Sequence, residues 1–557
     1  MDQVLITDST PTGTPVGEAL RVSSPEDVQW DATCDLLVVG IGLAGASATL
    51  RGSELGLDTI AVDRFIGGGS SELSGGVVYA GATHVQAELG IEDSVENLYN
   101  YISYETGELF SQPTLRKFSE DSPGLITWLE GYGVPFGGPV AVRKASYPPK
   151  GHFLYYSGNE NSPEGKTRAT PAPRGHRALP TFKSKERFSG VYIMTQLKQA
   201  IAAAANIKRM YHSAARRLVV DGEGRVVGAE IWQIPPGSLA ARLHAVAYLA
   251  GRSPTLVALN LNGPQWAVAS WLERRFAKPR LVRARKGVVL SAGGFVHNKT
   301  MTDRFAPLYT NMFRLGQQGD DGSGIRLGVS AGAITSSMST ISAWRFVSPP
   351  YDWPKGIFVS SEGKRFTNEE LYGARTSRAM YEKAGGKAWL IVDQPLIDSA
   401  KADIASGEMQ DFQLMAAKTW LRGAKKAKTV AGLEQVLGMP AGSLQAEVDA
   451  YNTAIATSAP DAQGKSDEMR SPLLTAPFYG LDISHRALAP LSGLTMGGLS
   501  LDEATGAARR PDGSAIPGLY AAGRNATGMC SNEYISGLSL ADCIWSGHRA
   551  AQSAAAS

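Results

Sequence analysis

The sequence predicts a protein of the α/β class with more than one domain, the first of them built on a parallel β-sheet. The chain has 557 residues, which is more than a single hydrophobic core usually organises. Its composition is globular, with 43% hydrophobic and 19% charged residues. The third observation is a glycine-spaced turn near the N-terminus, which lies between an apolar run and a helix-compatible stretch.

That turn has the spacing of a dinucleotide-binding motif. Residues 35–45 read DLLVVGIGLAG, an apolar strand followed by G-x-G-x-x-G at Gly40, Gly42 and Gly45. The first glycine permits a tight turn, and the second lets a pyrophosphate approach the N-terminus of the helix. The third glycine lets helix and strand pack closely. The next strand ends at Asp63, whose carboxylate can accept hydrogen bonds from an adenosine ribose. Together these features predict a dinucleotide site.

A second glycine- and serine-rich loop follows at once and distinguishes between dinucleotides. Residues 63–76 read DRFIGGGSSELSGG. Such a loop can offer backbone N–H groups and hydroxyls to phosphates and to a ribityl chain, which favours FAD over NAD; the alternative is a flexible surface loop. The candidate ligands here and in the first turn are Ala44, Arg64, Ser70, Ser71, Ser74, Gly75 and Gly76.

The two motifs together resemble the fumarate reductase/succinate dehydrogenase flavoprotein superfamily. KGVVLSAGGF (286–295) is similar to the strand and glycine turn that return to the FAD domain. GLYAAGRNATG (518–528) is similar to the last strand and loop before the helix that touches the flavin. The resemblance implies further FAD contacts at Ala292, Gly293, Gly523, Gly537, Ser539 and Leu540.

The resemblance also has two departures. Arg524 stands where the family has an acid, and we expect Glu533 to take that place near the ribityl chain. Family members with covalent flavin carry a histidine in the serine-glycine loop, where this chain has Ser71–Ser74. The resemblance therefore implies non-covalent FAD.

The domain organisation follows from the same resemblance. It implies a discontinuous, Rossmann-like FAD-binding domain at residues 31–299 and 480–557, with an inserted catalytic cap of α+β character at 300–479. Residues 1–30 are predicted to be an irregular, mobile N-terminal lead.

Residues 235–285 form an unusual apolar and basic insert between two stretches that are compatible with strands of one sheet. The insert contains Trp266 and Trp271, and its one acid is Glu273. Its basic residues gather at its end: Arg274, Arg275, Lys278, Arg280, Arg283 and Arg285. Two interpretations stay open, a peripheral membrane contact and a helical excursion packed on the domain or on a second subunit.

The substrate pocket is predicted to be apolar. In SGLTMGG (492–498), Leu494 stands where dicarboxylate enzymes of the superfamily have a histidine. Tyr372 and Gly373 occupy the region where those enzymes place an arginine, and Arg375 follows. Leucine and tyrosine do not bind carboxylates, so a pocket for an apolar ketone fits better. Within the superfamily such pockets resemble those of the 3-ketosteroid dehydrogenases.

In that branch the catalytic residues are tyrosines, which match Tyr372 and Tyr534 here. The Y-x-S pattern of Tyr534 and Ser536 resembles the Δ4-(5α) type, whereas the Y-x-x-x-G pattern of the Δ1 type is broken at Leu538. The resemblance implies that Tyr534 holds the carbonyl and that Tyr372, relayed through Ser536, removes the α-proton. A tyrosine with a pKa of about 10 is a weak base, so this role calls for a lowered pKa.

The function implied is FAD-dependent desaturation of a 3-ketosteroid, an oxidation of a CH–CH bond in steroid and lipid breakdown. A Δ1-dehydrogenase, a flavin ene-reductase working in the reducing direction and a flavin-bound scaffold on a membrane are the alternatives. A quinone-like electron acceptor is expected, and the chain is expected to be a monomer or homodimer. The net charge of +3 gives no sign of a nucleic-acid partner.

The cysteine pattern and the N-terminus bear on the metal content and the location of the protein. Cys34, Cys530 and Cys543 lack metal-ligand spacing, so we expect no metal and small buried side chains. No signal peptide or membrane span is recognisable. The prediction is a cytoplasmic protein, either free or peripheral on the inner face of the membrane.

Overall fold

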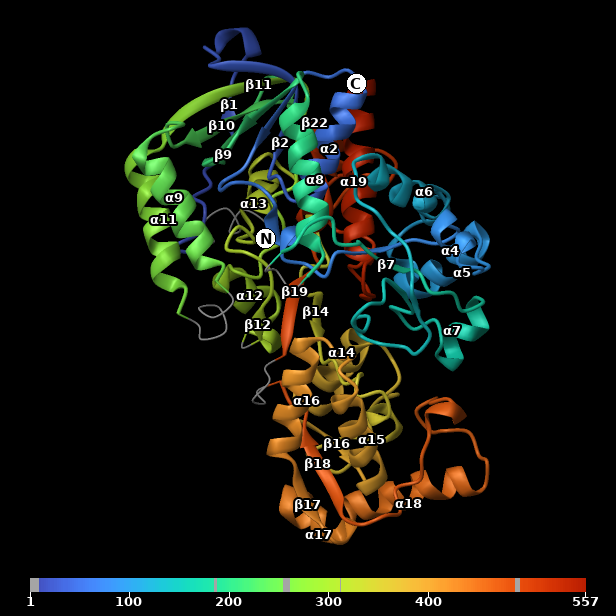
Figure 1. The fold of residues 1–557 in the computed structure, drawn as a ribbon. Coiled ribbons are helices and arrows are strands. Elements are labelled where there is room, and N and C mark those ends of the chain that lie inside the picture. The colour runs from blue at the N-terminus through green and yellow to red at the C-terminus, as the bar shows by residue number, and fades with distance from the viewer. Residues whose placement is uncertain (1–9, 185–187, 254–260, 311, 486–490) are drawn as a thin grey trace.

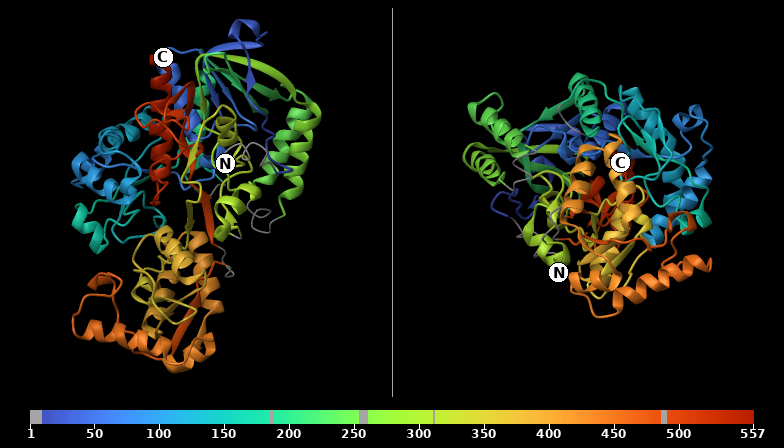
Figure 2. Two further views of the ribbon diagram at one scale, coloured as in Figure 1. Left: turned by 180° about the vertical axis from the view of Figure 1, so that it is seen from behind. Right: turned by 60° about the horizontal axis from the view of Figure 1, so that its bottom comes forward.

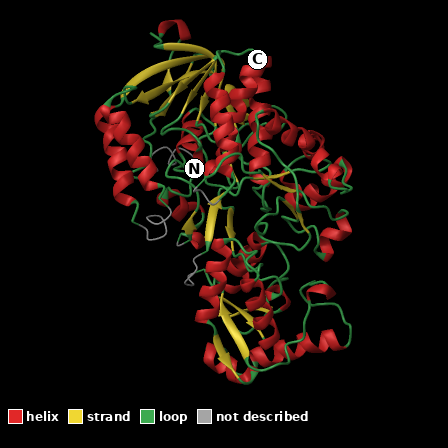
Figure 3. Ribbon diagram, viewed as in Figure 1, coloured by secondary structure: helices red, strands yellow, loops and turns green. Residues whose placement is uncertain are grey.

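The structure, a computed structural model, describes residues 10–184, 188–253, 261–310, 312–485 and 491–557. Two domains are apparent (Figure 1). The larger domain contains both ends of the chain, and the smaller one, which we call the cap, is joined to it through a narrow waist. Figure 2 shows the same division from behind and from below. Figure 3 shows helices packed beside the sheet of each domain.

The larger domain is built on a nine-stranded mixed sheet. The second half of β2 and all of β3 are apolar and buried, as expected of parallel strands covered on both faces. The order is β1 (Leu20–Arg21), β9 (Ser213–Val220), β10 (Val226–Gln233), β11 (Lys278–Leu290), β2 (Ala32–Val39), β3 (Thr59–Val62) and β8 (Ile207–Met210), with β22 (Ala515–Ala521) beside β11 and β21 (Ala507–Arg509) beside β22.

Two helices from opposite ends of the sequence pack against each other in this domain. They are α2 (Leu43–Glu54) and α19 (Leu538–Ala556). Gly547 allows the contact, because a Cβ there would lie 2.5 Å from the backbone oxygen of Ala44. The C-terminal helix is thereby fixed against the glycine turn that precedes α2. Other helices of this domain are α5 (Val95–Thr106), α6 (Gln112–Gly131), α8 (Gly190–Ala203), α12 (Lys299–Phe305) and α13 (Ser323–Ser330).

A small four-stranded sheet lies beside the start of α19. Its order is β4 (Val77–Tyr79), β7 (Gly175–Arg177), β6 (Leu154–Tyr155) and β5 (Val140–Ala141). The backbone N–H of Tyr79 donates to the oxygen of Gly537, and the N–H of Ser536 donates to Ser157. The segment before α19 is therefore held by the small sheet.

The cap has its own sheet and its own hydrophobic core. The antiparallel sheet has the order β15 (Ile357–Ser360), β16 (Ala388–Val392), β18 (Phe478–Asp482) and β17 (Lys425–Ala427). Around it lie α14 (Gly373–Ala384), α15 (Gln394–Ala405), α16 (Asp411–Gly423), α17 (Val430–Leu437) and α18 (Ser443–Ala456). The waist between the domains is a three-stranded sheet of β12 (Phe313–Arg314), β19 (Ser492–Thr495) and β14 (Ile341–Trp344).

The predicted start of the cap at residue 300 is too early. Met301, Ile325 and Met338 belong to the core of the larger domain. The chain enters the cap only through β14. The reason is that α13 packs against β9 and β11 of the large sheet, whereas Ala306, Tyr309 and Met312 pack with the core of the cap.

The described part of the N-terminal lead has little regular secondary structure, but it is anchored to the larger domain. Strand β1 pairs with β9. Thr14 is buried, and its N–H donates to Asp321 over 2.6 Å. Residues 1–9 of the predicted lead lie outside the described residues.

The insert forms a helical hairpin between two antiparallel strands, as its flanks predict. Strands β10 and β11 pair directly, and between them lie α9 (Leu239–Gly251) and α11 (Gly263–Phe276). Buried Tyr248 and Trp266 pack on Phe65 of the larger domain. The hairpin therefore packs on its own domain through this side. Within the described ranges, no helix combines the length and the apolar character needed to cross a membrane.

Candidate active site

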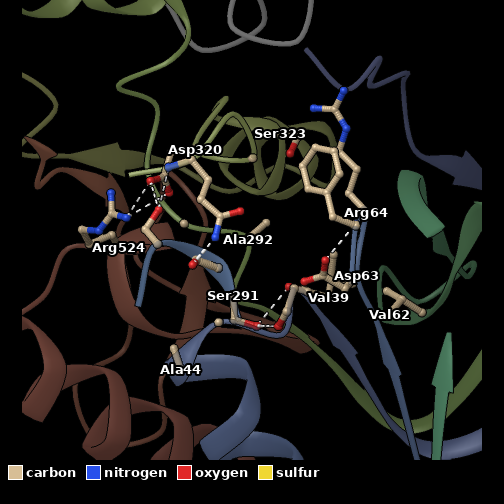
Figure 4. A pocket seen from close by; sticks show the side chains of 18 of the residues that line it. Val39, Ala44, Val62, Asp63, Arg64, Ser291, Ala292, Asp320, Ser323 and Arg524 are labelled. Carbon is tan, nitrogen blue, oxygen red and sulfur yellow. Dashed lines mark hydrogen bonds and ion pairs between the residues drawn. The ribbon is translucent and has the colours of Figure 1, made fainter. Parts of the chain in front are cut away.

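A cavity at the carboxyl ends of β2 and β3 contains the predicted dinucleotide motif. It is lined by Gly40, Gly42 and Ala44 of the first turn, by Asp63 and Arg64 after β3, and by Ser70 and Ser71 of the second loop. Ala292 and Gly293 line the opposite wall. Figure 4 shows Asp63 and Arg64 on one side of this cofactor cavity and Arg524 with Asp320 on the other.

The glycines of the first turn form a cradle without side chains. Gly40 has a φ of +97°, and a Cβ there would lie 2.7 Å from the oxygen of Ser291. A Cβ on Gly45 would lie 1.8 Å from the oxygen of Gly40, so this glycine serves the helix–strand contact. Gly42 begins α2 without a side-chain cap, which leaves the positive end of the helix facing the cavity.

The two ends of the cavity differ in charge. The Asp63 carboxylate is oriented by the N–H groups of Ile41 and Phe65, both at 2.8 Å, and it suits ribose hydroxyls. Arg64 lines the cavity beside it, but its guanidinium is bound by Glu273 and Asp321. The arginine therefore connects the cavity to the helical hairpin.

Arg524, the departure from the family pattern, binds Asp320 at 2.8 Å. Its Nη1 atom is buried and has no hydrogen-bond partner among the described residues, and neither has Nδ2 of Asn525. Asp320 in turn accepts a hydrogen bond from Ser70 over 2.5 Å. An unsatisfied buried donor beside a helix N-terminus fits an anionic ligand. The cavity therefore fits FAD.

The remaining predicted cofactor residues lie around the cavity rather than in its wall. Ser74 donates to Ser71 and accepts the N–H of Gly76, which shapes the second loop. Gly75 lies under Tyr147, and Gly523 packs on Ala44. Gly537, Ser539 and Leu540 begin α19.

Glu533 does not replace the missing acid. Its carboxylate binds Arg378 at 3.0 Å and lies 3.9 Å from Arg375. Both arginines belong to α14 of the cap, and Glu533 lines a separate cavity with Tyr534, which we call the third cavity. The expectation that Glu533 lies near the ribityl chain is wrong, because two cap arginines hold it in a different cavity.

The three predicted catalytic residues come together between the domains. The rings of Tyr372 and Tyr534 are 6.2 Å apart. Tyr534 also lies 5.0 Å from Trp344, which stacks on Phe346 at 5.8 Å. Tyr372 starts α14 of the cap, and Tyr534 precedes α19 of the larger domain. The two domains thus contribute one side each to an aromatic-walled site.

Ser536 is the polar centre of this site. The Tyr155 hydroxyl donates to its Oγ over 2.8 Å. Burial raises the pKa of the Tyr372 hydroxyl, and the nearby Ser536 hydroxyl opposes that rise. The hydroxyls of Tyr155, Ser536 and Tyr372 are therefore neighbours. Tyr372 also lines a second cavity between the domains, together with Lys144, Tyr156 and Glu370, which we call the interdomain cavity.

The lowered pKa expected for Tyr372 is wrong for the protein without ligands. Burial raises its pKa well above 10, and the hydroxyls of Tyr534 and Tyr155 raise it further; the nearby Ser536 hydroxyl only opposes this. Burial raises the pKa of Tyr534 as well. Both tyrosines are therefore neutral donors at pH 7.

The arginines near the site are engaged by acids. Arg375 contacts Glu105 at 3.2 Å, and Arg378 binds Glu533. Leu494 lies on β19 opposite Ser342 and packs among apolar residues. These two arginines therefore do not form the clamp that two carboxylates of a substrate would need.

Sequence reasoning missed part of the site. Tyr155 is not among the predicted site residues, and its hydrogen bond with Ser536 joins residues 381 positions apart. Gln317, Asp320 and Ser323 line the cofactor cavity from a stretch that was assigned to the cap. The run QQGDDGSG before α13 was the signal available for it, since it repeats a glycine turn before a helix. Cys34, Cys530 and Cys543 are buried and free, as predicted.

Comparison with known proteins gives matches over nearly the whole chain. A family model described as "FAD binding domain" matches residues 35–540. The chain is similar to 3-oxo-5-alpha-steroid 4-dehydrogenase of Comamonas testosteroni, with 36% identity over 530 residues, 91% of this chain and 96% of the relative. It is 28% identical to 3-oxosteroid 1-dehydrogenase of Mycobacterium tuberculosis, over 90% of this chain and 94% of the relative.

A solved structure is similar over its full length. It is 3-ketosteroid-Δ4-(5α)-dehydrogenase of Rhodococcus jostii in complex with 4-androstene-3,17-dione. The TM-score is 0.79 and the sequence identity 28%, and the match covers 97% of this chain and 100% of the other. The two-domain arrangement is therefore shared with a protein whose steroid complex is known.

Proposed function

The chain belongs to the FAD binding domain family, and we propose that it is an FAD-dependent 3-ketosteroid dehydrogenase that forms the 4-ene from a saturated 3-ketosteroid. The observation that carries this proposal is the group of neighbouring hydroxyls of Tyr155, Ser536 and Tyr372, which lies beside Tyr534 in an aromatic-walled site. Such a site suits a flat apolar ketone with one polar handle. The 36% identity with a 4-dehydrogenase supports the same regiochemistry.

FAD, when bound in the cofactor cavity, supplies the flavin N5 that accepts a hydride from the β carbon. The residues that would hold it are Gly40, Gly42, Asp63, Ser71 and Arg524. The glycine turn and Arg524 suit the pyrophosphate, and Asp63 suits the adenosine ribose.

Tyr534 is proposed to hold the steroid carbonyl. Its raised pKa keeps the hydroxyl protonated, so it can donate to the carbonyl oxygen as enolate charge develops there. Its hydroxyl lies 3.4 Å from Ser539 at the start of α19. A second donor to the carbonyl, a backbone N–H, is part of the proposal and is not assigned to a residue.

Ser536 and Tyr372 are proposed to remove the α-proton. Because Tyr372 is neutral in the free protein, the proton is passed along hydroxyls instead of being taken by a standing phenolate. Ser536 Oγ accepts the α-proton and gives its own proton to Tyr372, which releases a proton towards the interdomain cavity that it lines. The electrons of the broken α C–H bond form the C=C bond as the hydride leaves the β carbon.

Anaerobic reduction of the bound flavin tests the function directly. The yellow protein is mixed with 5α- and 5β-3-ketosteroids and with a 4-en-3-one in parallel. We expect bleaching of the flavin absorbance by a saturated 3-ketosteroid and a 4-ene product. Bleaching by the 4-en-3-one instead would indicate Δ1 chemistry. Failure with all of them, with reoxidation of the reduced protein by an enoate, would indicate an ene-reductase.

The electron acceptor is a separate part of the proposal. Each turnover leaves reduced FAD, so a second substrate must remove two electrons. We propose a quinone-like compound, since an apolar acceptor can use the same kind of site as a steroid. We expect a soluble quinone analogue to reoxidise the reduced FAD faster than dissolved oxygen does. Equal rates of reoxidation would count against a quinone-like acceptor.

A further inference from the structure

The outward side of the helical hairpin is apolar and uncovered. Leu239 is 71% exposed, Val246 61% and Trp271 54%. With Leu243, Leu249 and Val268, which are also exposed, these residues form what we call the hairpin face. On α9 the four apolar positions are three or four residues apart, which aligns them in one stripe. Exposed apolar residues that gather on two adjacent helices indicate an interaction surface.

The other side of the hairpin is firmly held by the larger domain. Phe65 stacks on Tyr248 with ring centroids 4.5 Å apart, and Glu273 binds Arg64 at 2.8 Å. His244 also contacts Glu273, at 2.9 Å. The hairpin therefore stays on the domain without help from its outward residues. Figures 1 and 2 show it at the outer edge of the larger domain, away from the cap.

The charge around the hairpin face is positive. Arg242, Arg275, Lys278 and Arg280 are exposed and form no ion pair with any residue in the described ranges. The only acid in residues 235–285 is Glu273, which is 5% exposed and paired with Arg64. Residues 235–285 thus contribute no unpaired acid that would repel an anionic partner, and their basic residues would attract one.

We propose that the hairpin face docks on the surface of a membrane that contains anionic lipids. A tryptophan beside apolar and basic residues on an amphipathic helix is the combination that enters the headgroup region. Val246, Trp271 and their neighbours would lie among the upper acyl chains, while Arg275 and Lys278 would contact lipid phosphates. The proposal rests on the hairpin itself and does not depend on the proposed steroid chemistry.

Vesicle sedimentation with the full-length, FAD-loaded protein tests it. We expect binding to vesicles of phosphatidylcholine with phosphatidylglycerol, weaker binding to phosphatidylcholine alone, and weakening as salt rises. Trp271 fluorescence should shift to shorter wavelength on binding, and the Trp271→Phe protein should lose that shift. Absence of binding to the anionic vesicles would overturn the proposal.

Variants separate the contribution of the apolar residues to membrane binding from the contribution of the basic residues. Val246→Glu with Trp271→Glu should lower the partition coefficient by at least about tenfold. The matched control is Val436→Glu with Leu474→Glu, two cap residues that are 53% and 69% exposed, which should leave binding unchanged. Arg275→Gln with Lys278→Gln should weaken binding to anionic vesicles by about fivefold per charge. If the control variant lost as much vesicle binding as Val246→Glu with Trp271→Glu, the hairpin face would not be a specific binding surface.

A second copy of the chain is the competing occupant of the hairpin face. Sedimentation velocity without vesicles distinguishes it: a wild-type dimer that Val246→Glu with Trp271→Glu dissociates would overturn membrane docking in favour of self-association. All these variants should reduce their flavin with a 3-ketosteroid as the wild type does. Loss of vesicle binding with intact flavin reduction therefore separates this proposal from the proposed function.

Discussion

At the scale of single residues, the site depends on hydroxyl groups whose pKa burial raises. Tyr372, Tyr534 and Ser536 could be identified from the sequence, because two short motifs contain them. Tyr155 could not, because only the small sheet carries it to Ser536. The raised pKa of Tyr372 also depends on burial between two domains, which no local pattern reports.

Tyr372→Phe should abolish turnover while FAD stays bound. Removing the hydroxyl leaves the proton of Ser536 without an acceptor, and general acid–base catalysis contributes about 10²- to 10⁴-fold. The flavin reduction rate, followed by stopped-flow absorbance at saturating steroid, is expected to fall by that factor. Near-normal reduction by the variant would show that Tyr372 has no part in proton transfer.

Tyr155→Phe should have a smaller effect, since Tyr155 orients Ser536 without contacting the reacting carbon. Loss of one buried hydrogen bond corresponds to about a five- to tenfold lower kcat, with KM little changed and an altered pH profile. Tyr156→Phe is the matched control, because its hydroxyl makes no hydrogen bond with the residues that the structure describes. A Tyr155→Phe protein with the control's kinetics would exclude the positioning role.

At the scale of elements, α19 connects the two halves of the chemistry. Its Ser539 contacts Tyr534, its Cys543 lines the cofactor cavity, and its body packs on α2. The turn into the helix needs Gly537, which has a φ of +92°. A Cβ there would lie 2.9 Å from the backbone nitrogen of Tyr79. The motif was visible in the sequence, whereas this steric reason for the glycine was not.

Gly537→Ala should lower both stability and FAD occupancy. The positive φ costs about 1 kcal/mol for alanine, and the clash with Tyr79 adds about 1–3 kcal/mol. Gly438→Ala is the control, since Gly438 has a φ of +69° but open space around its Cβ position. Thermal melting and the flavin absorbance per protein are the measurements. If both variants lost the same amount of stability and flavin absorbance, backbone movement would be relieving the clash between the Cβ added at position 537 and Tyr79.

Residues 365–369, which read RFTNE, belong to a buried ion-pair network of the cap. Arg365 binds Glu369 at 2.9 Å and Asp461 at 2.8 Å, and Lys465 binds Glu369 at 2.8 Å. All four side chains are nearly fully buried. The network ties the hairpin after β15 to the long loop after α18.

Arg365→Ala should therefore destabilise the cap. Glu369 and Asp461 would be left as buried acids without their arginine, which costs about 3–5 kcal/mol. Lys117→Ala removes an exposed i,i+4 pair with Asp121 and should cost less than about 1 kcal/mol. Urea unfolding compares the two. If Arg365→Ala lost as little unfolding free energy as Lys117→Ala, Lys465 would be compensating the negative charges of Glu369 and Asp461.

At the scale of the whole molecule, stability should depend on pH through buried histidines in several regions. Burial lowers the pKa of His176, His297 and His548 from 6.5 to about 4. Between pH 6.5 and about pH 4, the unfolded chain therefore binds more protons at these histidines than the native protein does. The stabilisation is complete above pH 6.5 and is lost as the pH falls from 6.5 to about 4.

The melting temperature should accordingly fall steadily between pH 7 and pH 5. His176 is 1% exposed and hydrogen bonds with Thr83 and Arg174. Its share is about 3 kcal/mol at full protonation. His176→Gln should flatten the slope of stability against pH, whatever its effect at pH 7. An unchanged slope would assign the pH dependence to other groups.

The sequence by itself determined the fold class, the cofactor and the chemical type of the site, because these depend on motifs of a few adjacent residues. Glycine spacing, an acid at a strand end and a Y-x-S pattern are local features. The tertiary structure decided what depends on contacts between distant segments. It set the cap boundary near β14, engaged Glu533 with cap arginines and added Tyr155 to the group of neighbouring hydroxyls. It also raised the pKa of Tyr372, because burial between domains is a property of packing.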